Sequence, residues 1–245
     1  MTNYPVRIHS ETGVHGEALS LFAPDPLIEA TEPLLGRNSS VLDVGAGYGT
    51  NGIYLAMQGH VVHALEINPE YIENGRRIMR GIGGIAISNR FVNEDMRNIR
   101  EVVGKIGKVD AVVATRSLQE LRKDEAYRMV NDVQDVTKPG GLNIVRAYIA
   151  TPEQQRVVPH LALFEPDELQ DIYTAAGWEM AMDYTYTLRP LGTIAGRPAC
   201  QSTAELVAVK PQTDDASRQR LISQAEYYRR SDPELFDYYM QQAGV

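Results

Sequence analysis

Three glycines that alternate with other residues follow an apolar run, and this pattern constrains the chain more than any other stretch. The apolar run is residues 41–44, and Gly45, Gly47 and Gly49 come directly after it. Such a run ending in glycines predicts a buried strand, a tight turn and then the start of a helix. Glycine permits positive φ and lets a ligand approach the backbone, while free amides in the first turn of the helix act as donors. The stretch therefore predicts a site for a nucleotide-like cofactor.

The spacing of the glycines differs from the dinucleotide fingerprint. The pattern G-x-G-x-x-G needs its third glycine at position 50, where this chain has Thr50. Residues 60–66 predict a second strand that ends in Glu66, about 20 residues beyond the loop. A carboxylate at that position can accept hydrogen bonds from both hydroxyls of a ribose. The loop and the acid together favour a ribose-containing cofactor.

With these residues the chain resembles the class I S-adenosylmethionine-dependent methyltransferases, whose first motif is an apolar strand, an acid and then G-x-G-x-G. The acid is Asp43, and Glu66 matches the ribose-binding acid of that family. Residues 93–96 match the segment that meets the adenine, and residues 137–141 match the turn before the fifth strand. The resemblance implies S-adenosylmethionine as cofactor and S-adenosylhomocysteine as its product. The cofactor-binding residues that it implies are Asp43, Gly45, Ala46, Gly47, Gly49, Asn51, Glu66, Ile67, Glu94, Asp95, Met96 and Thr115.

The order of the expected elements is that of an open α/β sheet. Strands are expected at residues 40–44, 61–65, 85–92, 109–114, 142–149, 178–186 and 204–209. Helices are expected at residues 26–35, 51–58, 69–82, 123–136 and 165–176. Strands and helices alternate as parallel crossover units require. We predict a Rossmann-like, doubly wound α/β fold with a seven-stranded, mostly parallel sheet and helices on both faces.

The length of 245 residues is compatible with one core and additions at both ends. We expect an N-terminal helical or lid segment at residues 1–39 and an S-adenosylmethionine-binding domain at residues 40–210. Residues 211–245 are expected to form a helical appendage, because tyrosines recur there at helical spacing. We expect these tyrosines to pack on the core or on another subunit.

Composition narrows the environment and the partners. Cys200 is the only cysteine, so no disulfide can form within the chain. No apolar run approaches the roughly 18 residues of a membrane span, and the first residues lack the features of a secretory signal. A net charge of −8 gives no electrostatic footprint for a nucleic-acid backbone. We expect a cytoplasmic protein with a small-molecule methyl acceptor, without a membrane, nucleic acid or metal as partner.

The acceptor is expected beside the segment that follows the fourth strand. Ligands of open α/β sheets meet the carboxyl ends of the strands, which places residues 115–119 near the reacting methyl group. Many amino-methylating members of the resembled family carry Asn/Asp-Pro-Pro-aromatic there, whereas residues 114–118 read Ala-Thr-Arg-Ser-Leu. The difference argues against methylation of DNA bases or protein amides.

The second half of the chain resembles the tellurite-resistance methyltransferases of the TehB type, through residues 137–147 and 162–169, and residues 9–11 match a further short stretch. That group methylates oxyanions of tellurium and selenium, with basic side chains near the anion. Arg189 and Arg197 fall in the matching segment, and with Arg116 they are the candidate catalytic residues. The family's histidine-arginine pair is Leu188-Arg189 in this chain, so the histidine is missing.

Several alternatives stay open at this point. The acceptor is a chalcogen oxyanion or a thiol in one hypothesis, and a small O- or N-nucleophile in another. An anionic nucleophile needs no base, whereas a neutral amine or phenol could lose its proton to His9, His15 or His160. A nicotinamide-dependent oxidoreductase is disfavoured by the position of the third glycine. A non-catalytic S-adenosylmethionine-binding sensor or subunit would carry the same binding motifs.

Overall fold

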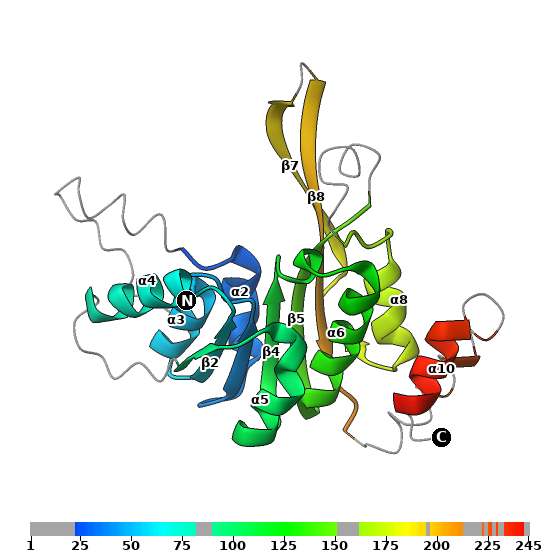
Figure 1. Ribbon diagram of the computed structural model, residues 1–245, viewed down its shortest axis with the longest axis horizontal. Coiled ribbons are helices and arrows are strands. Elements are labelled where there is room, and N and C mark those ends of the chain that lie inside the picture. The colour runs from blue at the N-terminus through cyan, green and yellow to red at the C-terminus, as the bar shows by residue number, and fades with distance from the viewer. Residues whose placement is uncertain are drawn as a thin grey trace.

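The computed structural model describes residues 23–81, 90–150, 162–194, 197–212, 222, 225–226, 229 and 233–242. Within these residues one eight-stranded sheet has the order β3-β2-β1-β4-β5-β8-β6, and β7 pairs with β8 (Figure 1). The strands are β1 (Ser40–Val44), β2 (Val61–Glu66), β3 (Arg90–Asn93), β4 (Val109–Thr115), β5 (Thr137–Tyr148), β6 (Glu179–Met180), β7 (Thr185–Ile194) and β8 (Arg197–Val209). The first five strands pair in parallel, and β8 is antiparallel to β5, β6 and β7. The doubly wound, mostly parallel sheet is confirmed.

Helices cover both faces of the sheet, as predicted. They are α2 (Pro26–Thr31), α3 (Thr50–Met57), α4 (Pro69–Gly81), α5 (Ile99–Ile106), α6 (Lys123–Val136), α8 (Glu168–Ala175) and α10 (Pro233–Gln242). Short 3₁₀ turns are η1 (Glu32–Leu34), η2 (Met96–Asn98) and η3 (Leu118–Glu120). In the described part of the chain, no helix combines the length and apolarity that a transmembrane span requires.

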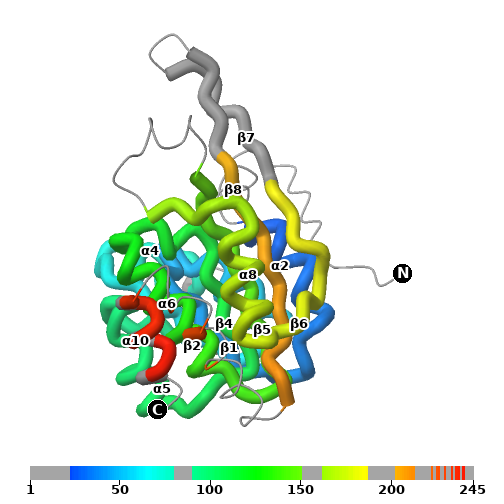
Figure 2. Tube along the Cα trace, turned by 90° about the vertical axis from the view of Figure 1, so that its right-hand side faces the viewer, coloured from blue at the N-terminus to red at the C-terminus, as the bar shows by residue number. Residues whose placement is uncertain are grey.

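The alternation of side chains along each strand creates two apolar layers. Val41 of β1 packs with buried residues of α2 and α3, whereas its neighbour Leu42 belongs to the layer that α5, α6 and α8 cover. Successive strand residues point to opposite faces, so a sheet that is buried on both sides needs continuous apolar runs. On the second face α6 and α8 lie side by side, where Lys123 of α6 pairs with Glu168 of α8 (Figures 1 and 2). These layers fix the carboxyl ends of the parallel strands at one edge.

Local signals in the sequence explain several element boundaries. Gly59 follows α3 with φ of 97°, a conformation that glycine adopts without steric cost. Pro69 is the first residue of α4, where its missing N–H costs nothing. On α10, Tyr239 is buried, as its helical spacing predicted, whereas Tyr227 and Tyr228 lie outside the described residues.

The structure differs from the expected elements in three places. The turn expected at residues 137–141 is an irregular stretch inside β5, where the pairing with β4 shifts register between Thr137 and Leu142 and Gly140 has φ of 76°. The stretch belongs to the strand because Gly140 donates to the Lys210 carbonyl and Lys210 donates back to Gly141. The strand expected at residues 178–186 is divided into β6 and β7 by a bend at 181–182, which accounts for the eighth strand. The helix α5 was not predicted, and the first residues of the third expected strand lie outside the described residues.

A long hairpin leaves the sheet at the edge where the parallel strands end. β7 and β8 stay paired from Thr185 and Glu205 to Ile194 and Arg197. Glu205 is in register with Arg146 near the end of β5, so the paired residues beyond it rise past the carboxyl ends of the other strands (Figure 1). The hairpin therefore stands on the edge where the resemblance predicts the site.

Candidate active site

The glycine loop between β1 and α3 has the open backbone that a bound cofactor needs. Gly45 has φ of 66° and lies against the loop after β4, since a Cβ added there would be 2.5 Å from Cβ of Ser117. Gly47 has φ of 56°, and a Cβ added there would meet no heavy atom within 4 Å. The first glycine is thus required by close packing, and the second borders open space. A side chain at position 47 would project into that space.

Glu66 closes the loop from the end of β2. One carboxylate oxygen accepts the amide of Gly47 at 2.8 Å, and the other accepts the amide of Asn68 at 2.8 Å. The side chain of Glu66 is buried, yet each oxygen keeps a second lone pair, because a carboxylate has about four acceptor positions. Both oxygens can therefore accept a hydroxyl of a ribose without losing the loop contact.

Asp43 supplies a buried acid beneath the loop. It is 1% exposed, and its Oδ2 has no hydrogen-bond partner among the residues that the structure describes. Burial raises the pKa of this carboxyl to about 7, although the backbone amide of Gly52 lowers it, and the charge of Glu66 raises it further. An unpartnered buried carboxylate is costly unless a cation or a donor meets it. The position suits a ligand that carries an ammonium or sulfonium group.

The segment after β3 lies against the same loop. Asn93 donates from Nδ2 to the carbonyls of Glu66 and Ile67, which fixes the turn after β2. Ile67 is 59% exposed, so an apolar surface remains for the flat face of a base. The Cε atom of Met96 lies 3.3 Å from the Cβ position of Gly45. Contact of these side chains with an adenine stays a prediction.

Some predicted cofactor residues already have protein partners. Ala46 donates its amide to the Leu65 carbonyl, and the Glu94 carboxylate accepts from Asn98 and the Asp95 amide. Asp95 caps η2 and forms an ion pair with Arg97 at 2.5 Å. The hydrogen bonds from Asn98 and Arg97 hold the pKa values of Glu94 and Asp95 below their usual range. Their side chains shape the loop, and contact with a cofactor through them stays a prediction.

Asn51, in the first turn of α3, connects the glycine loop with the end of β4. Its Nδ2 donates to Thr115 Oγ1 at 2.8 Å, and its Oδ1 accepts the amide of Asp25 at 2.8 Å. The structure thus brings together predicted residues from the loop and from the fourth strand, as the parallel sheet requires.

Arg116 follows Thr115 in a backbone conformation that is rare for a residue with a side chain. The φ of Arg116 is 54°, and its amide donates to the Arg146 carbonyl at 2.7 Å. The carbonyl of Arg116 accepts a hydrogen bond from Nε2 of Gln119. The backbone is fixed from both sides, whereas the side chain is 47% exposed. Next to it, Ser117 Oγ and Gln119 Oε1 are buried, and within the described part of the chain they have no hydrogen-bond partner. The segment after β4 therefore places a half-exposed guanidinium and two buried polar atoms at the carboxyl edge of the sheet.

Asp25 and Arg146 belong to this edge, and sequence reasoning did not select them. The Asp25 carboxylate, 1% exposed, lies 2.6 Å from Arg146 Nη1 and 3.8 Å from Arg116 Nη2. Arg146 also pairs with Glu205 of β8 at 2.8 Å. Two local signals were available: an aspartate directly before a helix-starting proline, and an arginine within the apolar run of β5.

The other two arginine candidates lie on the hairpin. Arg189 is in register with Gln201, and Arg197 is in register with Ile194 at the far end. Arg197 stands eight residues before Glu205 on β8, which at 3.2–3.4 Å per residue is about 26 Å along the strand. The described strands therefore do not bring Arg197 next to Arg116. His9, His15 and His160 lie outside the described residues.

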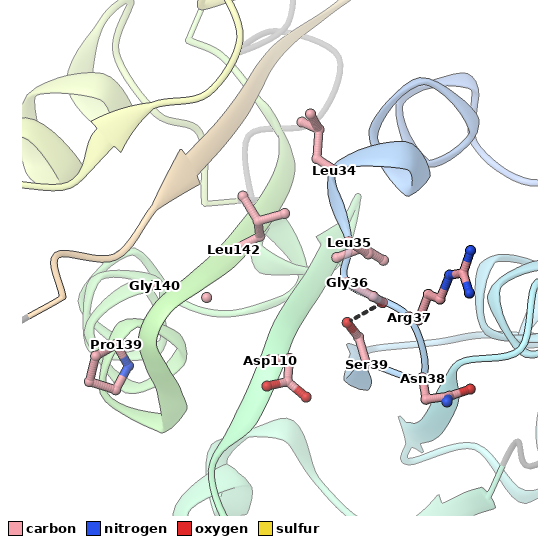
Figure 3. A pocket seen from close by; sticks show the side chains of 11 residues that line it. Leu34, Leu35, Gly36, Arg37, Asn38, Ser39, Asp110, Pro139, Gly140 and Leu142 are labelled. Carbon is pink, nitrogen blue, oxygen red and sulfur yellow. Dashed lines mark hydrogen bonds between the residues drawn. The ribbon is translucent and has the colours of Figure 1, made fainter.

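A pocket of about 300 Å³ lies at the opposite edge of the sheet. Residues 34–39 form one wall, and Asp110 with residues 139–142 forms the other (Figure 3). Asp110 is the second residue of β4, and residues 139–142 lie near the start of β5, so this pocket is at the amino ends of the strands. It is separate from the glycine loop, which follows the carboxyl end of β1. In the described residues, no cluster of potential ligands for a metal ion is present.

The fold and the loop together define the class. A doubly wound sheet with G-x-G-x-G after β1, an acid at the end of β2 and a polar segment after β4 is that of a class I S-adenosylmethionine-dependent methyltransferase. The chain matches the family described as Tellurite resistance protein TehB over residues 26–191. The chain belongs to this family.

Relatives and solved structures agree with the family. A probable S-adenosyl-L-methionine-dependent methyltransferase TehB from Haemophilus influenzae strain ATCC 51907 is 26% identical over 72% of this chain and 55% of that protein. A protein named Hemagglutinin 1 from Eikenella corrodens is 24% identical over 69% of this chain and 54% of its own length. The chain thus spans about half the length of the curated relatives that it matches.

Solved structures share the fold. The crystal structure of TehB from Haemophilus influenzae aligns with a TM-score of 0.60 at 19% identity, over 76% of this chain and 61% of that one. Magnesium protoporphyrin IX methyltransferase from Synechocystis PCC 6803, crystallised with bound S-adenosylhomocysteine, aligns with a TM-score of 0.57 at 15% identity, over 80% of this chain and 83% of that one.

The residues of the glycine loop and of the strand ends beside it fit S-adenosylmethionine, which is the cofactor of this class. The open space at Gly47 accommodates a ligand against the backbone, and Glu66 has free lone pairs for the ribose. The unpartnered Asp43 Oδ2 suits the positive end of the methionine moiety. An oxidoreductase is therefore not the class of this chain, since neither the family nor the loop spacing is of that kind.

Proposed function

We propose that the chain transfers the sulfonium methyl group of S-adenosylmethionine to a small anionic nucleophile, and that a selenium or tellurium oxyanion is the acceptor class to test first. The observation that carries the proposal is the half-exposed guanidinium of Arg116 after β4, beside the glycine loop. A thiolate is the second acceptor of the same charge.

The charges of this edge favour an anion. The side chains of Arg116 and Arg146 are balanced by Asp25 and Glu205, so these four groups sum to zero. When bound, the cofactor supplies an electrophilic methyl group on a positively charged sulfur. An anionic acceptor is then attracted by the sulfonium charge and by the half-exposed guanidinium of Arg116, whereas both would repel a cationic acceptor. An anion also has a lone pair available without a general base.

The protein's own contribution is positioning and exclusion of water. In the transfer, a lone pair of the acceptor forms the bond to the methyl carbon while the carbon–sulfur bond breaks and its electrons pass to sulfur. Arg116 orients the anion, and the buried segment of Ser117 and Leu118 keeps water from the reacting atoms. Alignment of two reactants in this manner supplies up to about 7–11 kcal/mol in favourable cases. Arg189 and Arg197 stay candidates for further contacts from the hairpin.

The first experiment measures cofactor and acceptor separately. Calorimetric titration with S-adenosylmethionine and S-adenosylhomocysteine, with NAD as the comparison ligand, tests the cofactor. Production of S-adenosylhomocysteine is then followed with selenite, tellurite, thiols and small phenols. Turnover with an oxyanion supports the proposal, and turnover with a neutral phenol or amine alone contradicts it. Binding of S-adenosylmethionine without turnover of any acceptor favours the sensor or subunit hypothesis.

The partners follow from the same reasoning. We propose a small-molecule acceptor as the substrate, a cytoplasmic location, and a division of the chain at residues 1–39, 40–210 and 211–245. The link from Asp25 to the sheet supports a first segment that reaches over the carboxyl edge.

A further inference from the structure

Asp25 is a buried carboxylate with an unusual set of neighbours. Its Oδ1 accepts the amide of Leu27 at 3.0 Å and so caps α2. Its Oδ2 lies between two guanidinium groups, at 2.6 Å from Arg146 and 3.8 Å from Arg116. A cap alone does not require a position between two cations, because a serine or an asparagine caps a helix equally well.

The two arginine side chains differ in exposure and in the number of carboxylates that hold them. Arg146 is 14% exposed and is held by carboxylates at both of its terminal nitrogens, since Nη2 pairs with Glu205 at 2.8 Å. The Arg116 side chain is 47% exposed, and Asp25 is the carboxylate that lies within 4 Å of it among the described residues. Arg146 is therefore fixed without Arg116, whereas Asp25 is the charged group that faces the guanidinium of Arg116 in the described part of the chain.

We propose that Asp25 is a positioning residue that holds the Arg116 guanidinium over the carboxyl end of β4, where the acceptor meets the methyl group. This inference rests on the proposed function, because Arg116 is the group that we assign to the acceptor. Asp25 reaches the site from the segment ahead of α2, and its amide donates to Asn51. The buried carboxylate thus links the start of α2, the first turn of α3 and the cation at the end of β4.

The test uses Asp25→Asn, which keeps the cap and the shape but removes the charge. The matched control is Asp110→Asn at the opposite edge of the sheet, where a carboxylate pairs with Lys138 at 2.7 Å and accepts from Ser40. With selenite as acceptor, we expect Asp25→Asn to raise the KM for selenite about tenfold, while the Kd for S-adenosylmethionine stays within about twofold. Asp110→Asn should leave both constants within about twofold.

A double-variant cycle separates positioning from general support of the fold. If Asp25 acts through Arg116, Asp25→Asn adds less than about twofold to the KM in the Arg116→Ala background. If Asp25→Asn raises the KM for selenite by the same factor in the wild-type and the Arg116→Ala backgrounds, the proposal is overturned. An unchanged KM in the single variant also overturns it.

A second readout does not depend on turnover. Phenylglyoxal modifies accessible arginines, and peptide mass spectrometry gives the rate at Arg116. We expect the rate to rise severalfold in Asp25→Asn and to stay unchanged in Asp110→Asn. If the wild-type protein does not methylate selenite, the proposed acceptor fails, but the rate at Arg116 still decides whether Asp25 holds it. An equal rate in all three proteins overturns the inference.

Discussion

The two halves of the carboxyl edge are built in different ways. On the cofactor half, Glu66 contacts Gly47 and Asn68 through their backbone amides, across 19 and 2 residues of sequence. On the acceptor half, Arg146 pairs with Asp25 and Glu205 through side chains, across 121 and 59 residues. The first half depends on glycine and on a strand that follows it closely. The second depends on charged groups that only the complete sheet brings together.

This difference separates what each half can tolerate. A backbone contact survives many changes of neighbouring side chains but is lost when the loop cannot keep its conformation. A buried pair of charges is lost when either partner changes, because the remaining charge has no compensation. We expect substitutions in the loop to abolish cofactor binding. Substitutions in the charge cluster should change the KM for the acceptor while the cofactor still binds.

The largest expected effect is that of Gly47→Val. The valine side chain would enter the open space beside the loop and would sit at φ of 56°, a conformation that β-branched residues rarely adopt. We expect the Kd for S-adenosylmethionine to rise at least about 100-fold, or about 2.7 kcal/mol, measured by calorimetry.

Gly59→Val is the matched control for this change. Gly59 also has positive φ, at 97°, and open space at its Cβ position, but it closes α3 at the far end from the loop. The strain of a valine at position 59 should lower the free energy of unfolding without changing the Kd for S-adenosylmethionine. Equal losses of affinity in both variants would show that strain, and not the cofactor space, explains the result at Gly47.

The next effect is that of Glu66→Gln. The amide group keeps the size of the side chain but replaces one acceptor by a donor, so either the Gly47 amide or the Asn68 amide loses its partner. We expect the Kd for S-adenosylmethionine to rise about tenfold, which corresponds to about 1.4 kcal/mol. Glu70→Gln, on the exposed first turn of α4, is the control. No difference between the two variants would remove Glu66 from the ribose site.

The buried carboxyl of Asp43 predicts that the affinity for the cofactor depends on pH. The pKa of Asp43 is about 7, so its carboxyl is mostly protonated at pH 6 and mostly ionised at pH 8. A cationic ligand needs the ionised form, and the Kd for S-adenosylmethionine should fall about tenfold between pH 6 and pH 8. Because this pKa is raised above its unfolded value near 4, the same group lowers the stability of the ligand-free protein as pH rises from about 4 to 7.

This pH dependence has two controls, the product S-adenosylhomocysteine and the variant Asp43→Asn. S-adenosylhomocysteine keeps the ammonium group but lacks the sulfonium charge, so the same slope for both ligands assigns the effect to the ammonium. Asp43→Asn should bind weakly with a flat profile. A flat profile in the wild-type protein would show that Asp43 does not face the positive charge of the ligand.

Sequence reasoning recovered the two halves unequally, for the same physical reason. Gly45 and Glu66 stand in a local order that only a strand, a tight turn and a second strand explain, so the fold and the cofactor loop could be predicted. Asp25 and Arg146 were missed, because their pairing spans 121 residues and neither lies in a motif. The division of β6 from β7 also depends on contacts with β8 that are distant in sequence.

The smallest expected effect on cofactor affinity concerns Asn51, which joins the two halves. Asn51→Ala leaves the buried amide of Asp25 and the hydroxyl of Thr115 without their partner, and an unmade buried hydrogen bond costs about 1–3 kcal/mol. We expect the free energy of unfolding in urea to fall by that amount, while the Kd for S-adenosylmethionine rises less than about fivefold. Asn74→Ala removes a surface contact with Arg77 and should change stability by less than about 0.5 kcal/mol. A large loss of affinity without a loss of stability would mean that Asn51 touches the cofactor itself, and the boundary between the two halves would then move to the end of β4.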